Sequence, residues 1–279
     1  MTIEDLLPPS PEFIDLYNHK IEVGIEYAKN IDLAIVCLAR NIGDRIKLSL
    51  PFLLNLPYFK SVNVVVFEND SSDNTKQLLN ELDREYTNLH LFTSYYNRPH
   101  LPLSKSNERT NHLAEYRNFC KNVVVDKLNH CQYTSVLDLD FIDISIRGWL
   151  NTFGWFAENE SLQAIAGNSF QFKNVFSNDY KSVWNYDSWA FRGNWWIDKQ
   201  TEVSAYDPML WFGFWITPVG SPLIKVNSAF GGLCTYKTNW LTLEAYEGYD
   251  CEHVCFHKNL YKYPKFNLSL NPSQTILFE

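Results

Sequence analysis

The sequence predicts an α/β fold in which helices flank a mostly parallel sheet. Short apolar runs alternate with segments of helical periodicity over residues 31–140, an order typical of β-α units joined by right-handed crossovers. Several of these runs are continuously hydrophobic, as expected of parallel strands buried on both faces. Polar and acidic clusters follow the predicted strands, at the carboxyl ends where such sheets bind ligands.

The N-terminal segment predicts a helix followed by a strand and a second helix. Ser10 and Pro11 form a typical start. Apolar side chains then recur at helical spacing, namely Phe13, Tyr17, Ile21, Ile25 and Ala28. The apolar run 31–38 predicts a buried strand, and residues 46–56 predict a helix that stops near Pro57.

The next segments continue the alternation. Residues 62–67 are β-branched and predict a second strand, which an acidic turn joins to a helix over 76–85. Residues 89–93 predict a third strand and 134–139 a fourth. Between them we expect a polar loop over 94–108 and a long helix over 109–127, whose inward residues are Leu113, Tyr116, Cys120 and Val123.

Composition indicates a folded, non-membrane protein. Of 279 residues 46% are hydrophobic and 20% charged, which excludes disorder. The net charge of −8 argues against nucleic acid or an anionic membrane as main partner. We find no signal peptide and no apolar run near the ~20 residues of a transmembrane helix. Six scattered cysteines fit a reduced setting, so we expect a cytoplasmic protein.

The first acidic cluster ends the predicted strand 62–67 and contains Glu68 and Asp70. A carboxylate at this position can accept hydrogens of uracil or guanine, and the following helix N-terminus favours an anion. The alternative is an ordinary acidic turn that caps the next helix. Glu68 and Asp70 are therefore candidate nucleotide-binding residues.

The second cluster, Asp138-Leu139-Asp140, ends the predicted strand 134–139. Residues two apart in a strand point to one face, so both carboxylates can converge at the edge of the sheet. A divalent cation that bridges diphosphate oxygens would relieve their repulsion, and hard oxygen donors suit Mn²⁺ or Mg²⁺. The alternative is an acidic surface turn.

The third cluster holds Asp250, Glu252, His253 and His257. On a helix the two histidines lie one turn apart, where either can bind metal or phosphate, and Asp250 or Glu252 can deprotonate an acceptor hydroxyl. The alternative is a helix with partly exposed polar residues. Cys251 and Cys255 raise the possibility of zinc, but the usual ligand spacing is absent.

Arginines on the predicted helix 109–127 supply positive charge. Arg109 and Arg117 lie two helical turns apart beside an apolar stripe and need anionic partners, for which a nucleoside diphosphate is suited. The alternative is a salt bridge to Glu115 or Glu108. Arg40 and Arg45 follow the first predicted strand and can reach the same place.

An aromatic-rich region spans residues 153–216. Its tryptophans can stack on sugar rings, although most must be core. They are Trp155, Trp184, Trp189, Trp195, Trp196, Trp211 and Trp215. Asp187, Arg192 and Asp207 are near enough in sequence to bind sugar hydroxyls.

These motifs together resemble those of GT-A glycosyltransferases. They are residues 34–41, 68–75 and 113–118, the pair Asp138 and Asp140, and residues 251–254. Their order is most similar to the fungal capsule-associated α-mannosyltransferases over residues 31–257. We expect no membrane anchor or stem of the kind common among secretory-pathway members.

The resemblance implies one Rossmann-like GT-A domain over 1–279. Residues 31–140 would bind a nucleotide sugar, GDP- or UDP-linked, and residues 141–279 would add an aromatic-rich extension for a glycan acceptor. It also implies base binding by Glu68 and Arg40, metal and diphosphate binding by Asp138 and Asp140, and donor contacts from Arg117. A C-terminal acid or histidine would lie at the reaction centre.

We therefore expect a metal-dependent glycosyltransferase, either inverting or retaining. A sugar nucleotidyltransferase would usually carry a glycine- and lysine-rich phosphate loop, but only Gly43 follows the first predicted strand. A carbohydrate-binding protein without catalysis is the other alternative, and it would bind sugar without nucleotide or metal.

Overall fold

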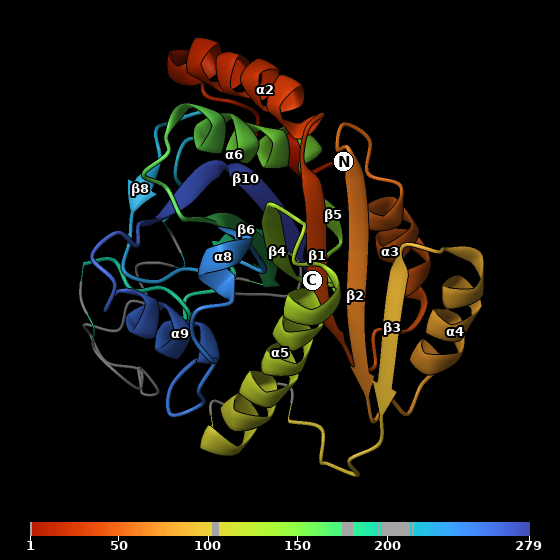
Figure 1. The fold of residues 1–279 in the computed structure, drawn as a ribbon. Coiled ribbons are helices and arrows are strands. Elements are labelled where there is room, and N and C mark those ends of the chain that lie inside the picture. Colours follow the sequence, from red (N-terminus) through yellow and green to blue (C-terminus); the bar gives the residue numbers. More distant parts are fainter. Residues whose placement is uncertain (1, 102–105, 175–180, 195, 197–212, 214) are drawn as a thin grey trace. The chain divides into compact units, whose positions relative to one another are not determined.

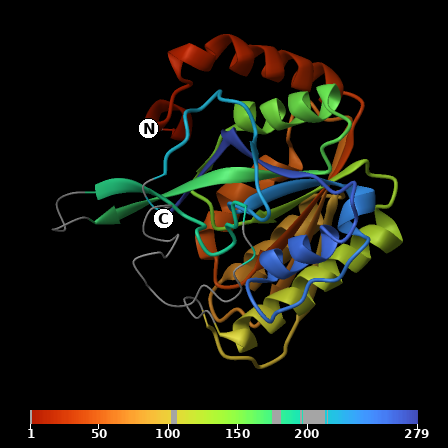
Figure 2. The ribbon, with the colours of Figure 1, turned by 90° about the vertical axis from the view of Figure 1, so that its left-hand side faces the viewer.

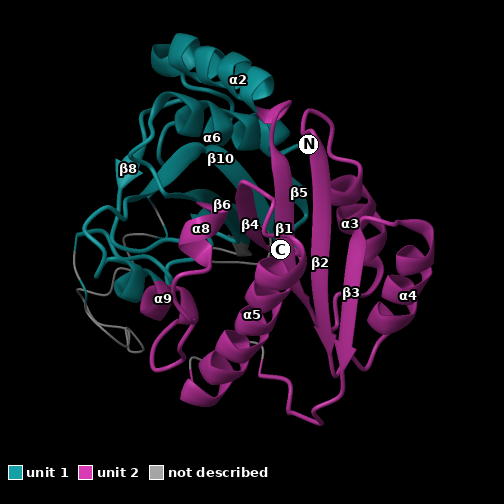
Figure 3. Cartoon of the chain, in the orientation of Figure 1, with its two compact units in different colours: residues 1–27, 141–234, 257–279 teal, residues 28–140, 235–256 magenta. Residues whose placement is uncertain are grey.

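The computed structural model describes all residues except 1, 102–105, 175–180, 195, 197–212 and 214. The chain divides into two compact units, shown in Figure 3. One unit comprises residues 28–140 and 235–256. The other comprises residues 1–27, 141–234 and 257–279. The sequence predicted one domain whose two halves meet near residue 140, and it gave no sign that residues 235–256 pack with 28–140.

The unit containing residues 28–140 is built on a parallel sheet. Its strands lie in the order β3-β2-β1-β4, and all three neighbouring pairs are parallel. Their bounds are Asp32–Ala39 for β1, Ser61–Asn69 for β2, Leu89–Ser94 for β3 and Tyr133–Asp138 for β4. The four predicted strands are confirmed, with ends shifted by one or two residues.

Helices cover both faces of this sheet. Helices α3 (Ile46–Leu54) and α4 (Thr75–Glu85) lie on one face, and α5 (Asn107–Lys127) crosses β1 and β2 on the other (Figures 1 and 2). The short helix η2 (Gly43–Arg45) precedes α3. Ser106 caps the N-terminus of α5, because its hydroxyl accepts from the Arg109 amide.

The C-terminal part of this unit follows β9 (Leu233–Lys237), within which the division between the units falls. It comprises α8 (Thr238–Leu241) and the start of α9 (Glu252–Leu260). Paired hydroxyls connect Thr134 with Thr238 at 2.9 Å and Ser135 with Thr235 at 2.7 Å. These buried hydrogen bonds hold Thr235 and Thr238 against β4.

The other unit is built on a mixed sheet. Strands β6 (Ala164–Asn174) and β10 (Leu268–Phe278) are parallel. Antiparallel to them run the short strands β5 (Asp143–Ile144), β7 (Lys181–Asn185) and β8 (Ile224–Lys225). Helix α6 (Ile146–Glu158) packs on β10. The helices α1 (Ile3–Leu6), η1 (Pro11–Phe13) and α2 (Ile14–Ala28) open the chain.

Two glycines let α2 and α6 approach closely. A Cβ at Gly24 would overlap the Leu150 carbonyl, and a Cβ at Gly154 would overlap the Lys20 carbonyl. The predicted packing role of the first helix is confirmed, because Tyr17 and Ile21 are buried.

Replacing Gly154 by alanine should therefore lower the free energy of unfolding. The added methyl meets backbone that cannot rotate away, so we expect a loss of about 1–3 kcal/mol. Urea denaturation followed by circular dichroism measures it. Alanine otherwise favours a helix interior over glycine, so an unchanged or increased stability would show that the helices separate without cost.

The described residues include no helix long and apolar enough to span a bilayer. All six cysteines are buried free thiols.

Candidate functional site

The carboxyl ends of the parallel strands bring together residues far apart in the sequence. Leu38 on β1 lies opposite Phe67 on β2 and Asp138 on β4. The next position pairs Ala39 with Glu68. The first turn of α5 lies at the same end as the arrowheads of β2 and β3 (Figure 1). Two of the predicted clusters, with the arginine-bearing helix, therefore meet at one edge of the sheet.

Arg117 joins the second and third clusters. Its Nε donates to Glu252 Oε1 at 2.9 Å, and its Nη2 lies 3.2 Å from Asp138 Oδ1. The side chains of Arg117 and Glu252 are 6% and 4% exposed, whereas that of Asp138 is 27% exposed. The sequence left open a salt bridge of Arg117 with Glu115 or Glu108. Its partners in the structure are instead Asp138 on β4 and Glu252 on α9.

The pKa of Arg117 reflects this environment. Burial by itself would lower it, but the charges of Glu252 and then Asp138 outweigh burial and raise the pKa above its usual value. Arg117 is therefore a fixed cation that holds two carboxylates in place at any accessible pH.

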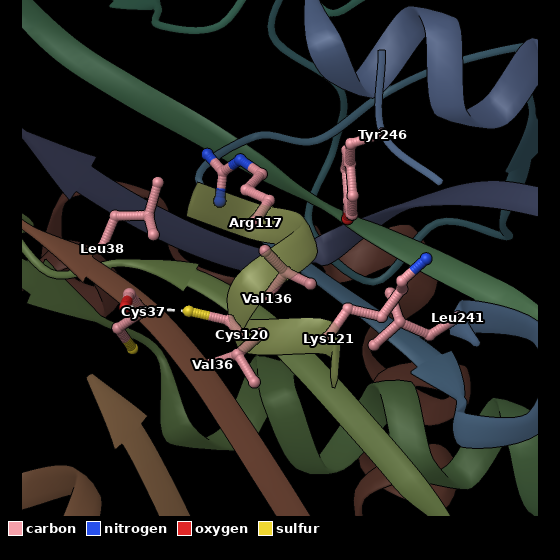
Figure 4. A pocket seen from close by; sticks show the side chains of 9 residues that line it. All are labelled: Val36, Cys37, Leu38, Arg117, Cys120, Lys121, Val136, Leu241 and Tyr246. Atoms are coloured by element: carbon pink, nitrogen blue, oxygen red, sulfur yellow. Dashed lines mark hydrogen bonds between the residues drawn. The ribbon is translucent and has the colours of Figure 1, made fainter. Parts of the chain in front are cut away.

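A small cavity of about 10 Å³ lies beside Arg117 (Figure 4). Its walls are mostly apolar and come from β1, β4 and α5, with Leu241 of α8 and Tyr246 completing the lining. The Cys120 thiol contacts the Cys37 carbonyl at 3.9 Å, and burial raises the pKa of Cys120 to about 12. This thiol stays protonated, so it packs under Arg117 and takes no part in acid-base chemistry.

The Asp138-Leu139-Asp140 motif is divided between a strand and a turn. Strand β4 ends at Asp138, Leu139 is buried, and Asp140 lies in the following turn with an exposed side chain. Arg45 Nη1 donates to the Asp140 carbonyl at 3.0 Å and fixes that turn. The strand prediction extended one residue too far, to Leu139.

Asp138 and Asp140 are the two carboxylates predicted to bind a metal. Among the described residues no three His, Cys, Asp or Glu side chains are grouped as metal ligands. Carboxylates are nevertheless the donors that Mg²⁺ and Mn²⁺ prefer, and such ions often take their remaining ligands from substrate phosphates and water. The donor chemistry of Asp138 and Asp140 fits an ion of that kind and does not fit an all-protein cage.

A cationic cleft lies at the ends of β1 and β2. Its volume is about 180 Å³, and its lining includes Arg40, Asn69, His100, Arg109 and His112. Burial first, and then the charges of Arg40 and Arg109, lower the pKa of His100. The cleft therefore carries positive charge that favours an anionic ligand.

Arg40 and Arg109 were both predicted to bind a ligand, and the structure brings them to this one cleft. Arg40 donates to the carbonyls of Arg98 at 2.6 Å and Pro99 at 3.2 Å, while its Nε is buried without a hydrogen-bond partner in the structure. Because a buried N–H is costly to leave unpaired, this atom is suited to a ligand or a bridging water.

The loop after β3 is fastened by Asp70. Its carboxylate accepts from the Tyr96 and Asn97 amides at 2.8 and 2.9 Å and from Arg98 at 3.3 Å. Burial would raise the pKa of Asp70, but these bonds, with that from Asn69, lower it. Asp70 positions this loop, and direct contact with a nucleotide stays a prediction.

Glu68, like Asp70, accepts hydrogen bonds from backbone amides. It is 1% exposed and accepts from the Ser71 amide at 2.9 Å. It therefore holds the turn beside Asn69, which lines the cleft. Its contact with a nucleobase stays a prediction.

The third cluster is buried. Asp250, Glu252 and His253 are 3%, 3% and 2% exposed, and Asp250 Oδ1 accepts from the Cys251 amide at 2.7 Å. His253 Nε2 lies 3.6 Å from Glu252 Oε1. Glu252, His253 and His257 lie on helix α9, so the two histidines are one helical turn apart.

His257 lies one turn further along α9. Its Nδ1 is 2.9 Å from Ser228 Oγ, and burial lowers its pKa to about 3, so it is neutral. Metal binding by His253 or His257 stays a prediction.

The aromatic-rich region is only partly described, since Trp195, Trp211 and Asp207 lie outside the described residues. Trp155, Trp184, Trp189, Trp196 and Trp215 are half-buried. Arg192 is fully buried and donates to the Trp189 and Phe191 carbonyls at 2.8 and 2.9 Å. Asp187 accepts from the Gly231 amide at 3.0 Å. Both side chains bind backbone here, where the sequence suggested contact with sugar hydroxyls.

Sequence reasoning missed the side chains contributed by the loop after β3. Arg98 stacks over Tyr96, with its Cζ 4.4 Å from the ring centroid, and binds Tyr116 Oη at 3.0 Å and Glu115 at 2.8 Å. His100 lines the cleft. The rule that ligands bind beyond the carboxyl ends of strands also applies to β3 and would have identified this loop.

Comparison with known proteins gives matches at the level of structure. No protein-family model and no curated protein sequence matches the chain. The structure resembles the mannosyltransferase PcManGT from Pyrobaculum calidifontis, solved with GDP-Man and Mn²⁺. The TM-score is 0.50 at 12% identity, over 94% of this chain and 68% of that one.

Two further structures are similar. GalNAc-T7, solved with UDP, GalNAc and Mn²⁺, gives a TM-score of 0.58 at 12% identity, over 98% of this chain and 53% of its own. TarS of S. aureus gives 0.50 at 13% identity, over 89% and 36%. This chain thus spans about half the length of GalNAc-T7 and about a third of the length of TarS.

At such low identity these similarities show the fold alone. The predicted fold class is confirmed: the chain has an α/β, GT-A-type fold with a mostly parallel sheet flanked by helices. The matches do not single out the fungal capsule-associated group.

Proposed function

We propose that this protein transfers a sugar from a nucleoside diphosphate sugar to a carbohydrate hydroxyl with the help of a divalent metal. The observation that carries the proposal is the buried Arg117, which ties Asp138 to Glu252 at the carboxyl edge of the parallel sheet. The cationic cleft at the same edge supports it. GDP-mannose and a UDP-sugar are both candidate donors, since the three similar proteins include examples solved with GDP-Man and with UDP.

The cleft suits the nucleotide. Arg40 and Arg109 offer guanidinium groups, whose charge and N–H donors suit phosphate oxygens, and Tyr116 adds an aromatic wall. Asn69 contributes an amide that both donates and accepts. We assign the donor's nucleoside diphosphate to these residues, with Glu68 and Asp70 holding the turn and loop that shape the cleft.

Asp138 and Asp140 are the residues that would hold Mn²⁺ or Mg²⁺. A bound ion of this kind neutralises charge on a leaving diphosphate. Arg117 fixes the Asp138 carboxylate and adds a cation close by. The residues that orient the donor are therefore anchored to the sheet, which keeps the site organised before substrate arrives.

The transfer breaks the bond between the anomeric carbon and the diphosphate oxygen and forms a bond to the acceptor oxygen, whose proton must leave. Asp250 and Glu252 are the candidates to take that proton in an inverting reaction. Glu252 Oε1 already accepts the hydrogen bond from Arg117 Nε at 2.9 Å, so this carboxylate is engaged in holding the arginine. Asp250 is thus our first choice, and Glu252 positions Arg117.

Nucleotide binding tests the proposal. Thermal unfolding is measured with UDP, GDP, CDP and dTDP, each with and without Mn²⁺. One nucleotide should stabilise the protein by about 2.7 kcal/mol at about 100 times its Kd, and only with the metal. If no nucleotide raises the unfolding temperature of a folded sample, the proposal is wrong, and a carbohydrate-binding protein is the better alternative.

A further inference from the structure

A second depression runs along α5, on a different stripe of the helix from the cleft. Its volume is about 680 Å³, and its walls are α5, Tyr96 and the loop 246–249. We call it the α5 groove. Its α5 side is lined by Asn111, Ala114, Glu115, Asn118, Phe119 and Asn122. All its residues belong to the compact unit that carries the candidate site.

The polar side chains of the groove recur at helical spacing. Asn111, Glu115, Asn118 and Asn122 are four, three and four residues apart, so they form one row on the helix surface. That row is about 16 Å long at 1.5 Å per residue. An amide donates and accepts hydrogen bonds, as a sugar hydroxyl does. The row therefore matches an extended ligand rich in hydroxyls.

Aromatic rings flank this row. Tyr96 and Tyr249 remain 38% and 37% exposed, and Phe119 is half-buried between the polar residues of α5. Flat apolar rings next to hydrogen-bonding groups suit the alternating C–H and O–H surfaces of a pyranose.

The charge of the groove disfavours anionic ligands. None of its lining residues is Lys, Arg or His, whereas Glu115 and Glu247 are acidic. Arg98 pairs with Glu115 at 2.8 Å, so the negative charge that has no such pair in the lining is that of Glu247, whose side chain is exposed. Phosphate- or uronate-bearing polymers would be repelled, so an uncharged glycan fits best.

The groove is built in advance of any ligand. The Asn118 side chain donates to the Tyr246 carbonyl at 2.9 Å and accepts from its amide at 2.8 Å. Thr110 donates to the Gly248 carbonyl, and a Cβ at Gly248 would overlap Asn111. With the loop clamped to α5, binding requires little ordering of the protein.

The groove shares its walls with the candidate site. Helix α5 carries Arg117, and the loop 246–249 leads within three residues to Glu252. Tyr96 stacks on Tyr116, which lines the cleft, at a centroid separation of 5.7 Å. A glycan in the groove would therefore lead towards the reacting end of the site.

We propose that the α5 groove binds an uncharged oligosaccharide that serves as the acceptor. The role as acceptor rests on the proposed function, whereas the binding of the oligosaccharide does not. Asn111, Asn122 and Glu247 bind hydroxyls, Tyr96 and Tyr249 contact sugar rings, and Asn118 holds the wall.

Binding to the full chain tests this. Calorimetry and saturation-transfer NMR are run with hexasaccharides of glucose, mannose and N-acetylglucosamine, and with hexagalacturonate as the anionic probe. At least one uncharged probe should bind, and hexagalacturonate should not. The double variant Asn122→Ala/Glu247→Gln should weaken binding at least tenfold. The matched variant Asn129→Ala/Glu108→Gln, whose sites are exposed outside the groove, should leave it unchanged.

The metal-dependent nucleotide shift is measured on the same samples. If that shift persists while no uncharged hexasaccharide binds, or while the groove variant binds as tightly as the original protein, the groove proposal fails and the proposed function stands. If the shift is absent but the groove variant loses glycan binding, the groove proposal stands as a binding site and the transferase function fails. Tighter binding of hexagalacturonate than of the uncharged probes would also overturn the proposal.

Discussion

Replacing Arg117 by methionine is expected to lower the free energy of unfolding by about 3–5 kcal/mol, because it leaves a buried carboxylate without its cation. Glu252 is 4% exposed and takes its 2.9 Å hydrogen bond from Arg117. Methionine fills a similar volume, so the loss arises mainly from charge. Chemical denaturation of the variant and the original protein measures the difference.

Two further variants separate charge from packing. Arg117→Met combined with Glu252→Gln removes both charges, so it should recover much of the lost stability. Arg117→Lys keeps the charge but cannot span Asp138 and Glu252 as a planar guanidinium does, so it should fold and bind Mn²⁺-nucleotide more weakly. A double variant no more stable than Arg117→Met would show that the ion pair is not what Arg117 contributes.

The β-α alternation could be predicted from the sequence because its signals are local. An apolar run, as in β1, β2 and β4, or a helical spacing, as in α5, depends only on residues that are neighbours in the sequence. The predictions of these elements are therefore in error only at the element ends. Strand β4, for example, stops at Asp138 because Asp140 is held in a turn by Arg45. The return of residues 235–256 to this unit carries no local signal.

The site was predictable as a region but not as a set of contacts. Helical spacing indicated that Arg117 faces the protein, yet its partner Glu252 is 135 residues away. Glu115, a possible partner by spacing, binds Arg98 from the loop after β3. Only the tertiary structure distinguishes between these arginine–glutamate pairings, because each of them joins opposite charges equally well.

The second large effect is expected at Asp140. Its side chain is exposed, so Asp140→Asn should change the free energy of unfolding by no more than about 0.5 kcal/mol. If Asp140 helps to hold the metal, removing its charge should lower turnover by about 10²–10³-fold, the usual cost of losing one electrostatic contact at a reaction centre. Release of nucleoside diphosphate from GDP- and UDP-sugars in Mn²⁺ buffer measures turnover.

Asp138→Asn provides the contrast, because Asp138 also pairs with Arg117 at 3.2 Å. It should lose both turnover and stability, whereas Asp140→Asn should lose turnover alone. Asp126→Asn, an exposed site on the last turns of α5, controls for the change in net charge. A metal ligand has a further signature: raising the Mn²⁺ concentration should restore part of the activity of Asp140→Asn. If full activity survives in Asp140→Asn at every Mn²⁺ concentration, the metal is not held by this pair, and the acidic turn is only a surface feature next to Arg45.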